Sequence, residues 1–175
     1  MTATTYSVIS DTKLLSRQNK EPFLGPQCLF DTNVLLWYLS GDERLSKEAR
    51  ESIESQSGRK YISIVSAWEV AIKISLGKLK VEGGTTLFWR TFVEGGFMGL
   101  PITIESVEAV ESLPFHHRDP FDRLLIATAL THGLELVATD DIFSKYSKED
   151  VLGGTSSLHA LNTYVPEAVK TDLKS

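Results

Sequence analysis

Four acidic residues stand where an apolar run of the sequence ends or where a helix is expected to begin. They are Asp31, Glu69, Asp122 and Asp140. A carboxylate near an apolar core is costly unless it is paired, hydrogen-bonded or bound to a cation. Four such groups therefore predict a shared site for a hard divalent ion, with Mg²⁺ expected and Mn²⁺ as a substitute. The chemistry suited to such a site is metal-assisted hydrolysis.

The elements expected around these residues form an alternating series of strands and helices. Apolar or β-branched runs predict strands at residues 27–32, 61–66, 100–104 and 134–139. The segments between them predict helices at residues 33–39, 46–56, 67–77, 85–96, 105–113, 120–133 and 141–146. This alternation implies an α/β fold with a central parallel sheet covered by helices on both faces. Because parallel strands place their carboxyl ends at one edge, all four acidic residues can converge there.

Serine and glycine mark where several of these helices begin and end. Ser46 and Ser66 are the expected N-caps of the two helices that follow them. Gly77 and Gly133 are expected to end the helices that precede them. A cap at Ser66 places Glu69 one turn into its helix.

The composition is that of a single globular domain. A chain of 175 residues with 42% apolar and 23% charged residues is long enough for one full core and ordinary in its balance. No apolar run approaches the ~20 residues that span a bilayer. The first 20 residues also lack the hydrophobic segment of a secretory signal. These features predict a cytoplasmic protein without a membrane span.

Regular patterning is confined to the middle of the chain. Residues 27–146 are expected to form the domain. Residues 1–26 are rich in Ser, Thr and Lys and are expected to form an N-terminal extension. Residues 147–175 are expected to form a C-terminal extension with weak structure at best.

Charge and cysteine content narrow the class of site. The net charge of −5 argues weakly against an extended surface for duplex nucleic acid. A cation bound among the four acids would reverse the local sign, so the charge says little against a metal-dependent nuclease. Cys28 is the single cysteine, which excludes an internal disulfide and a cysteine-based zinc site.

Each acidic residue also has a structural interpretation. Asp31 and Asp140 could be helix N-caps, and Asp122 could favour the helix dipole from a first turn. Glu69 could pair with Lys73 on the surface of a helix, a contact worth about 0.3–0.5 kcal/mol. The metal site is favoured because all four residues fall on the same expected edge.

Four segments together resemble the successive motifs of PIN-domain ribonucleases, most closely the VapC-like toxins of type II toxin–antitoxin systems. The segments are FDTNVLLWYL, ISIVSAWEVAIKISLGKL, HHRDPFDRLLIATAL and LVATDDIFSKY, within residues 27–146. The resemblance implies a Rossmann-like sheet and Mg²⁺- or Mn²⁺-dependent cleavage of RNA. The family's four acidic positions match the four residues above. Its further motif positions match Thr32, Asn33 and Ser66.

Two of the acidic positions have an acidic neighbour. In the family pattern the acid that opens the apolar helix is the ligand, which favours Asp122 over Asp119. Asp119 would then cap the helix or orient a ligand. Asp140 is favoured over Asp141 because Phe143 and Tyr146 follow it at the family's spacing.

Basic residues near these acids are candidates for contact with RNA. Lys73 lies one turn after Glu69, and His116, His117, Arg118 and Arg123 flank Asp122. Arg123 could instead pair with a carboxylate of the cluster. The two histidines lack metal-ligand spacing and nearby partners, so zinc is not expected.

The sequence thus predicts a metal-dependent endoribonuclease, with Asp31, Asp122 and Asp140 as ligands. Glu69 would be a further ligand or would orient the attacking water. The resemblance also implies a homodimer, for which residues 35–39 or 88–92 could supply an apolar face, and an antitoxin partner. One alternative is a catalytically inactive PIN-like module that binds RNA or a protein. Another is a small-molecule phosphatase, which usually needs a second Asp two residues after the first; Asn33 stands there.

Overall fold

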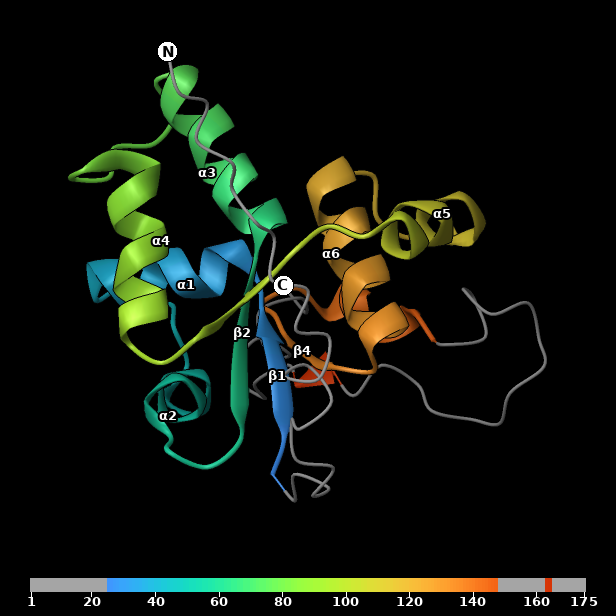
Figure 1. The fold of residues 1–175 in the computed structure, drawn as a ribbon, viewed down its shortest axis with the longest axis horizontal. Coiled ribbons are helices and arrows are strands. Elements are labelled where there is room, and N and C mark those ends of the chain that lie inside the picture. The colour runs from blue at the N-terminus through green and yellow to red at the C-terminus, as the bar shows by residue number, and fades with distance from the viewer. Residues whose placement is uncertain (1–24, 148–162, 165–175) are drawn as a thin grey trace, which may run out of the picture.

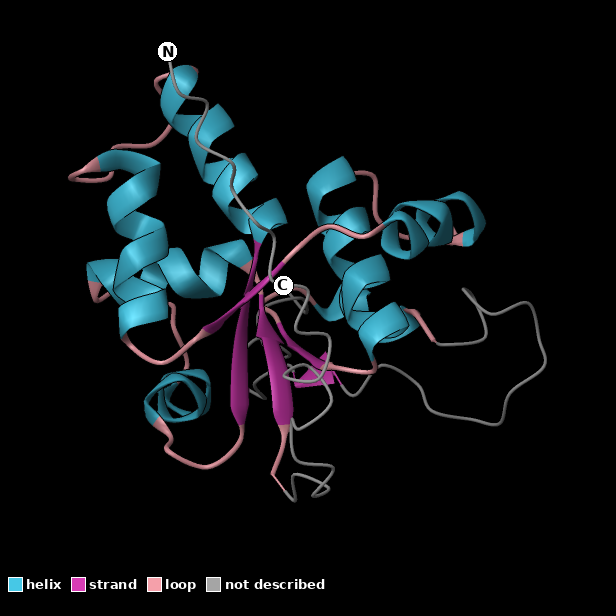
Figure 2. Cartoon of the chain, viewed as in Figure 1, coloured by secondary structure: helices cyan, strands magenta, loops and turns pink. Residues whose placement is uncertain are grey.

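A computed structural model of the chain describes residues 25–147 and 163–164. Within them lies one five-stranded sheet in the order β3-β2-β1-β4-β5, and every neighbouring pair is parallel (Figures 1 and 2). The strands are β1 (Gln27–Phe30), β2 (Arg59–Ser63), β3 (Met98–Leu100), β4 (Glu135–Val137) and β5 (Thr163–Tyr164). The α/β fold with a parallel central sheet is confirmed.

Helices cover both faces of this sheet. They are α1 (Thr32–Ser40), α2 (Lys47–Glu54), α3 (Ile64–Ser75), α4 (Gly84–Glu94), α5 (Ile104–Ser112), α6 (Pro120–His132) and the 3₁₀-helix η2 (Asp141–Lys145). In Figure 1, α5 and α6 lie on one side of the strands, and α1, α2 and α4 lie on the other. None of the described helices is long and apolar enough to cross a bilayer.

Alternation along the strands divides the core into two. Leu29 and Leu136 belong to the cluster under α5 and α6, whereas Phe30 and Val137 belong to the cluster under α1, α2 and α4. Successive side chains of a strand point to opposite faces, so a sheet covered on both faces needs continuous apolar strands. That requirement explains the consecutive apolar residues at the ends of β1 and β4, which are Cys28–Phe30 and Leu136–Val137.

The second strand ends and α3 begins three residues earlier than expected. Ser63, not Ser66, is the N-cap: its Oγ accepts a hydrogen bond from the amide N–H of Val65 at 3.1 Å. Residues 61–66 are rich in apolar and β-branched side chains and contain a serine at both positions 63 and 66, so their composition cannot separate a strand from the first turn of a buried helix. Ser66 therefore lies inside the first turn of α3, on the same side as Glu69.

The third strand is also shorter and earlier than expected. It comprises Met98–Leu100, in register with β2, and stops before Pro101. Proline has no amide N–H to donate to a neighbouring strand, so the ladder ends there. Thr103 then caps α5 by accepting a hydrogen bond from the amide of Ser106.

The fifth strand was not predicted. Thr163–Tyr164 pairs in parallel with β4 at the end of the sheet, within the segment expected to be a C-terminal extension. Two residues are too few to give a periodic signal in the sequence. Residues 148–162 and 165–175 of that extension, and residues 1–24 of the N-terminal one, lie outside the described part of the chain.

The other helix caps follow the prediction. The Oγ of Ser46 accepts a hydrogen bond from the amide of Ala49 and starts α2. Gly133 ends α6 in the left-handed conformation, with φ of 65°. Glycine adopts this conformation without the penalty a side chain incurs.

The two segments expected to support dimerisation are partly buried in the domain. Leu35 in the first segment, and Phe88 and Phe92 in the second, are buried beneath the helices and serve the core under α1, α2 and α4. Leu39 in the first segment is exposed. A dimer face on either segment stays a prediction.

Candidate active site

Asp31 lies at the centre of the carboxyl edge of the sheet, directly after β1. It is the N-cap residue of α1 and is 1% exposed, yet its side chain makes no capping hydrogen bond. Its Oδ1 is buried with no hydrogen-bond partner. A buried carboxylate oxygen without a partner is costly. The residue therefore does not act as an ordinary helix cap.

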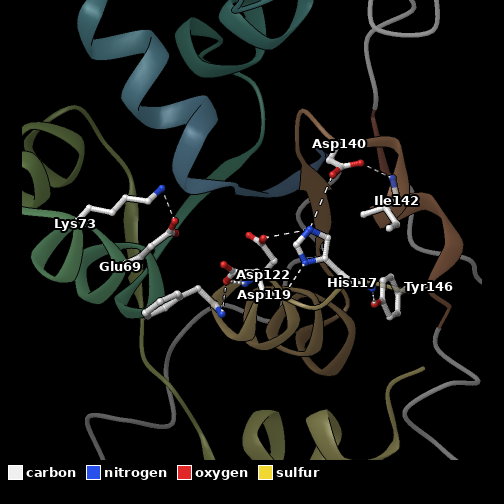
Figure 3. Close-up of polar contacts among 9 residues, drawn as sticks. Glu69, Lys73, His117, Asp119, Asp122, Asp140, Ile142 and Tyr146 are labelled. Carbon is white, nitrogen blue, oxygen red and sulfur yellow. Dashed lines mark hydrogen bonds and ion pairs between the residues drawn. The ribbon is translucent and has the colours of Figure 1, made fainter. Parts of the chain in front are cut away.

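Glu69 reaches the same edge from α3. It is 8% exposed, and the Nζ of Lys73 lies 2.6 Å from its Oε1 (Figure 3). One turn earlier, Ser66 is fully buried and its Oγ has no hydrogen-bond partner. In the described part of the chain, Asp31 Oδ1 and Ser66 Oγ are the two buried side-chain atoms left without one. Both belong to the predicted site.

Asp122 stands in the first turn of α6, and Asp119 is the N-cap of that helix. The Oδ1 of Asp119 accepts a hydrogen bond from the amide of Phe121 at 2.8 Å and lies 3.4 Å from the amide of Asp122. Asp119 is thus engaged in capping, which leaves Asp122 to face the other acids. The placement agrees with the preference for Asp122 as the ligand.

Asp140 follows β4 and is the N-cap of η2. Its Oδ1 accepts a hydrogen bond from the amide of Ile142 at 2.9 Å, and the side chain is about half exposed. Asp140 is therefore the most open of the four acids. The side chain of Asp141 lies outside the described part of the structure.

His117 lies between two of these acids. Its Nε2 is 3.3 Å from Oδ2 of Asp122 and 3.9 Å from Oδ2 of Asp140 (Figure 3). Lys73 and His117 together place one basic group beside Glu69 and another between Asp122 and Asp140. No basic side chain within residues 25–147 forms an ion pair with Asp31.

The electrostatics of the edge raise the pKa of two of the acids. Burial, followed by the charges of Asp122 and Glu69, raises the pKa of Asp31 from 3.8 to about 8. Burial also raises the pKa of Asp122 to about 6, although His117 opposes that shift. Both shifts come first from burial and then from the neighbouring carboxylates, so the charged form of each acid is disfavoured where it stands.

The donor set fits a hard divalent cation. Carboxylate and hydroxyl oxygens are what Mg²⁺ and Mn²⁺ prefer, and Asp31 Oδ1 and Ser66 Oγ are buried with nothing else to bind. Among the residues that the structure describes, no three carboxylate, imidazole or thiol groups stand close enough together to hold an ion as they are placed. A bound cation would have to draw the carboxylates closer together than their mutual repulsion favours.

The remaining predicted site residues occupy different surroundings. Thr32 is buried in the first turn of α1. Asn33 lines a cleft of about 460 Å³ between α1, α4 and the loop before α4. Both follow Asp31 directly, so the start of α1 joins the acidic edge to this cleft.

Arg123 does not have either of the roles considered for it. It is 4% exposed, and its guanidinium donates to the carbonyl oxygens of Val110, Leu113 and Pro114 at 2.8–2.9 Å. These carbonyls lie at the end of α5 and just beyond it, where helix carbonyls lack partners of their own. Arg123 therefore fastens α5 to α6 and is not placed to pair with a carboxylate or with RNA.

The sequence does not predict the position of His117 between two of the acids. Two adjacent histidines have no specific spacing, so they indicate only a possible contact with RNA or a zinc ligand. The signal that could have found it is the interval of five residues between His117 and Asp122, across the capping turn at Asp119. A capping turn of this kind brings the preceding loop back toward the first turn of the helix.

Comparisons with known proteins identify the family of the domain. The sequence model of the family described as PIN domain matches residues 28–149. Among solved structures, VapBC2 from Rickettsia felis bound to a promoter DNA fragment is similar with a TM-score of 0.50 and 12% identity, covering 65% of this chain and 86% of that chain. A toxin–antitoxin complex from Klebsiella pneumoniae gives a TM-score of 0.48 at 22% identity, covering 80% and 98%. FitAB bound to an IR36 DNA fragment gives a TM-score of 0.46 at 20% identity, covering 65% of this chain and 85% of that chain. No curated protein matches the sequence.

Proposed function

The chain belongs to the PIN-domain family, whose members are generally nucleases, and on that premise we propose that it is a metal-dependent endoribonuclease. One observation carries the proposal. Asp31 is buried at the carboxyl edge of the sheet with an unpartnered oxygen, and Asp122 and Glu69 raise its pKa. A fold keeps so unfavourable a carboxylate where function requires it.

Asp31, Asp122 and Asp140 would hold the ion, Mg²⁺ or Mn²⁺, with Glu69 as a further ligand or as the group that orients the attacking water. When bound, the cation would supply positive charge that keeps the buried acids ionised and neutralises the charge growing on the scissile phosphate. Asp140 is the most exposed of the four acids, so substrate would approach from its side.

The neighbouring residues would support this arrangement in separate ways. Lys73 lies against Glu69 and is one-third exposed, so it can hold that carboxylate and still face a phosphate of the substrate. Ser66 offers a buried hydroxyl beside the site. Thr32 and Asn33 carry the site toward the adjoining cleft, and Asp119 fixes the helix turn that presents Asp122.

We propose that the chain forms a homodimer through the outer face of α3. Ile64, Trp68, Ile72 and Leu76 are spaced four residues apart and are each 38–61% exposed. Residues at this spacing share one face of a helix. The Trp68 ring packs edge-on against Phe121, with centroids 4.9 Å apart, which extends the face onto α6. A continuous apolar stripe of this kind marks an interaction surface on a domain of this size.

The proposed biological role is that of the toxin in a toxin–antitoxin pair, acting on RNA in the cytoplasm. The domain belongs to the PIN family, it is similar in fold to VapBC2 from Rickettsia felis, and its motifs resemble those of VapC-like toxins. An antitoxin that inhibits this chain would have to neutralise the acidic edge, for which an arginine is suited.

Cleavage of RNA tests the proposal directly. Wild type and Asp31→Asn would be incubated with tRNA, rRNA fragments and single-stranded RNA in Mg²⁺, Mn²⁺ or EDTA. Cutting that needs the ion and disappears in Asp31→Asn is the expected result. Full activity of Asp31→Asn would refute the assignment of the site. Failure of well-folded wild type to cut any RNA would favour a catalytically inactive module that binds RNA or a protein.

A further inference from the structure

Two contacts hold the imidazole of His117, and a third holds its backbone. The amide N–H of Asp119 donates a hydrogen bond to its Nδ1 at 3.1 Å. Its ring stacks on Phe143, with centroids 5.7 Å apart and planes inclined by 17°. Its own amide N–H donates to the hydroxyl of Tyr146 at 2.6 Å. Phe143 and Tyr146 are both buried in the core, so the residues that His117 packs against are fixed in place.

These contacts determine which ring nitrogen carries a proton. Because Nδ1 accepts the Asp119 amide proton, the neutral ring carries its own proton on Nε2. That nitrogen lies 3.3 Å from Asp122 and 3.9 Å from Asp140. A protonated Nε2 has no lone pair for a metal ion, so in this orientation His117 faces the carboxylates as a donor and not as a ligand.

We propose that His117 is a positioning residue for the cation site, holding the Asp122 carboxylate through Nε2–H and fixing its place relative to Asp140. The proposal rests on the function proposed above. Asp122 lies on α6 and Asp140 lies in the turn after β4. His117 contacts both carboxylates, and its ring also stacks on Phe143 in η2. With Oδ2 of Asp122 beside the imidazole, its other oxygen is left to bind the ion. Residues that orient metal ligands in this way contribute to affinity without touching the metal.

Two substitutions separate the roles of the two ring nitrogens. In His117→Gln the side-chain amide reaches the position of Nε2 and can still donate to Asp122. In His117→Asn the shorter side chain reaches only the position of Nδ1, where its oxygen can still accept from Asp119. Both variants lose the stacking on Phe143. Tighter binding by His117→Gln than by His117→Asn would therefore assign the effect to the Nε2 contact, because the Asn variant is the one that keeps the contact with Asp119. His116→Gln is the matched control, because its exposed ring lies against Tyr146 and not against the acids.

The first readout is the affinity for Mn²⁺, measured by calorimetry on the full chain with thermal melts to compare folding. We expect His117→Asn to bind about 10–100-fold more weakly than wild type. His117→Gln should recover most of that loss, and His116→Gln should bind as wild type does. The second readout needs no ion: imidazole ¹⁵N shifts of the ion-free protein at pH 8 should show the proton of His117 on Nε2.

Three results would overturn the inference. One is wild-type affinity in His117→Asn while Asp31→Asn has lost binding, which would leave the cation site standing without a role for His117. Another is a His117 ring protonated on Nδ1. The third is equal loss in the Gln and Asn variants, which would assign the effect to packing. Absence of Mn²⁺ binding by wild type itself would overturn the proposed function first and this inference with it.

Discussion

Replacing Asp31 with Asn should make the ion-free protein more stable while removing its activity. The folded-state pKa of Asp31, about 8, lies above its ordinary value of 3.8. Between about pH 4 and pH 8 the folded protein therefore holds a proton that the unfolded chain has released. The stability that this group contributes is fully present below its ordinary pKa, and it is lost as the pH rises toward the folded-state pKa. Asparagine does not titrate, so its variant escapes the loss.

The magnitude follows from the width of the window. One pKa unit corresponds to about 1.4 kcal/mol, and about three units separate the ordinary pKa from pH 7, so the penalty at pH 7 reaches about 4 kcal/mol. At pH 4.5 it falls to about 1 kcal/mol by the same relation. Local relaxation and water penetration reduce such penalties, so we expect Asp31→Asn to gain about 2–4 kcal/mol at pH 7. For a chain of this length that is a rise in Tm of roughly 4–16 °C.

Denaturant unfolding in EDTA at pH 4.5, 6, 7 and 8 measures this effect. The gain of Asp31→Asn over wild type should grow with pH, and adding Mg²⁺ should stabilise wild type but not the variant. Asp42→Asn is the control, because Asp42 is paired with Arg44 and its pKa is lowered to about 2. That variant should gain nothing at any of these pH values. Equal or lower stability of Asp31→Asn at pH 7–8 would refute the electrostatic account of the site.

Three further substitutions test other parts of the structure. Arg123→Met should lower stability by about 3 kcal/mol, measured by denaturant unfolding, because three carbonyls lose their buried charged donor; a neutral effect would contradict this. Ser63→Ala should cost about 1 kcal/mol in the same assay, and Ser66→Ala clearly less, since only Ser63 caps α3; the reverse order would restore the sequence-based assignment. Trp68→Asp should convert the proposed dimer to a monomer in light scattering without unfolding it, whereas a monomeric wild type or a mass unchanged by the substitution would refute this interface.

The parts of the fold that the sequence predicted are those with a repeated or local signal. The apolar runs of β1, β2 and β4, each followed by a helix, were enough to predict a parallel sheet, since few other arrangements bury such strands on both faces. The same reasoning placed Asp31 and Asp140 at one edge, because that edge follows from strand direction alone. Glu69 and Asp122 followed from the spacing of their helices.

The parts that were missed depend on contacts between distant residues. Ser63 and Ser66 are both small hydroxyl residues after an apolar run, and only the end of pairing between β2 and its neighbours decides which one caps α3. Arg123 looks like a site residue in the sequence because it adjoins Asp122. Its partners lie 9–13 residues away, at the end of another helix, and no local pattern identifies them.

Contacts outside the acidic edge hold the elements that carry its carboxylates. A buried carboxylate such as Asp31 destabilises the ion-free fold, so the elements that carry the acids must be fixed by other contacts. Arg123 ties α6 to the end of α5, and Tyr146 and Phe143 hold the loop of His117. None of these three contacts a carboxylate, yet each restricts where Asp122 can stand. Repulsion among the acids is therefore resisted by residues outside the site, which keeps the carboxylates close enough together for a cation to gather them.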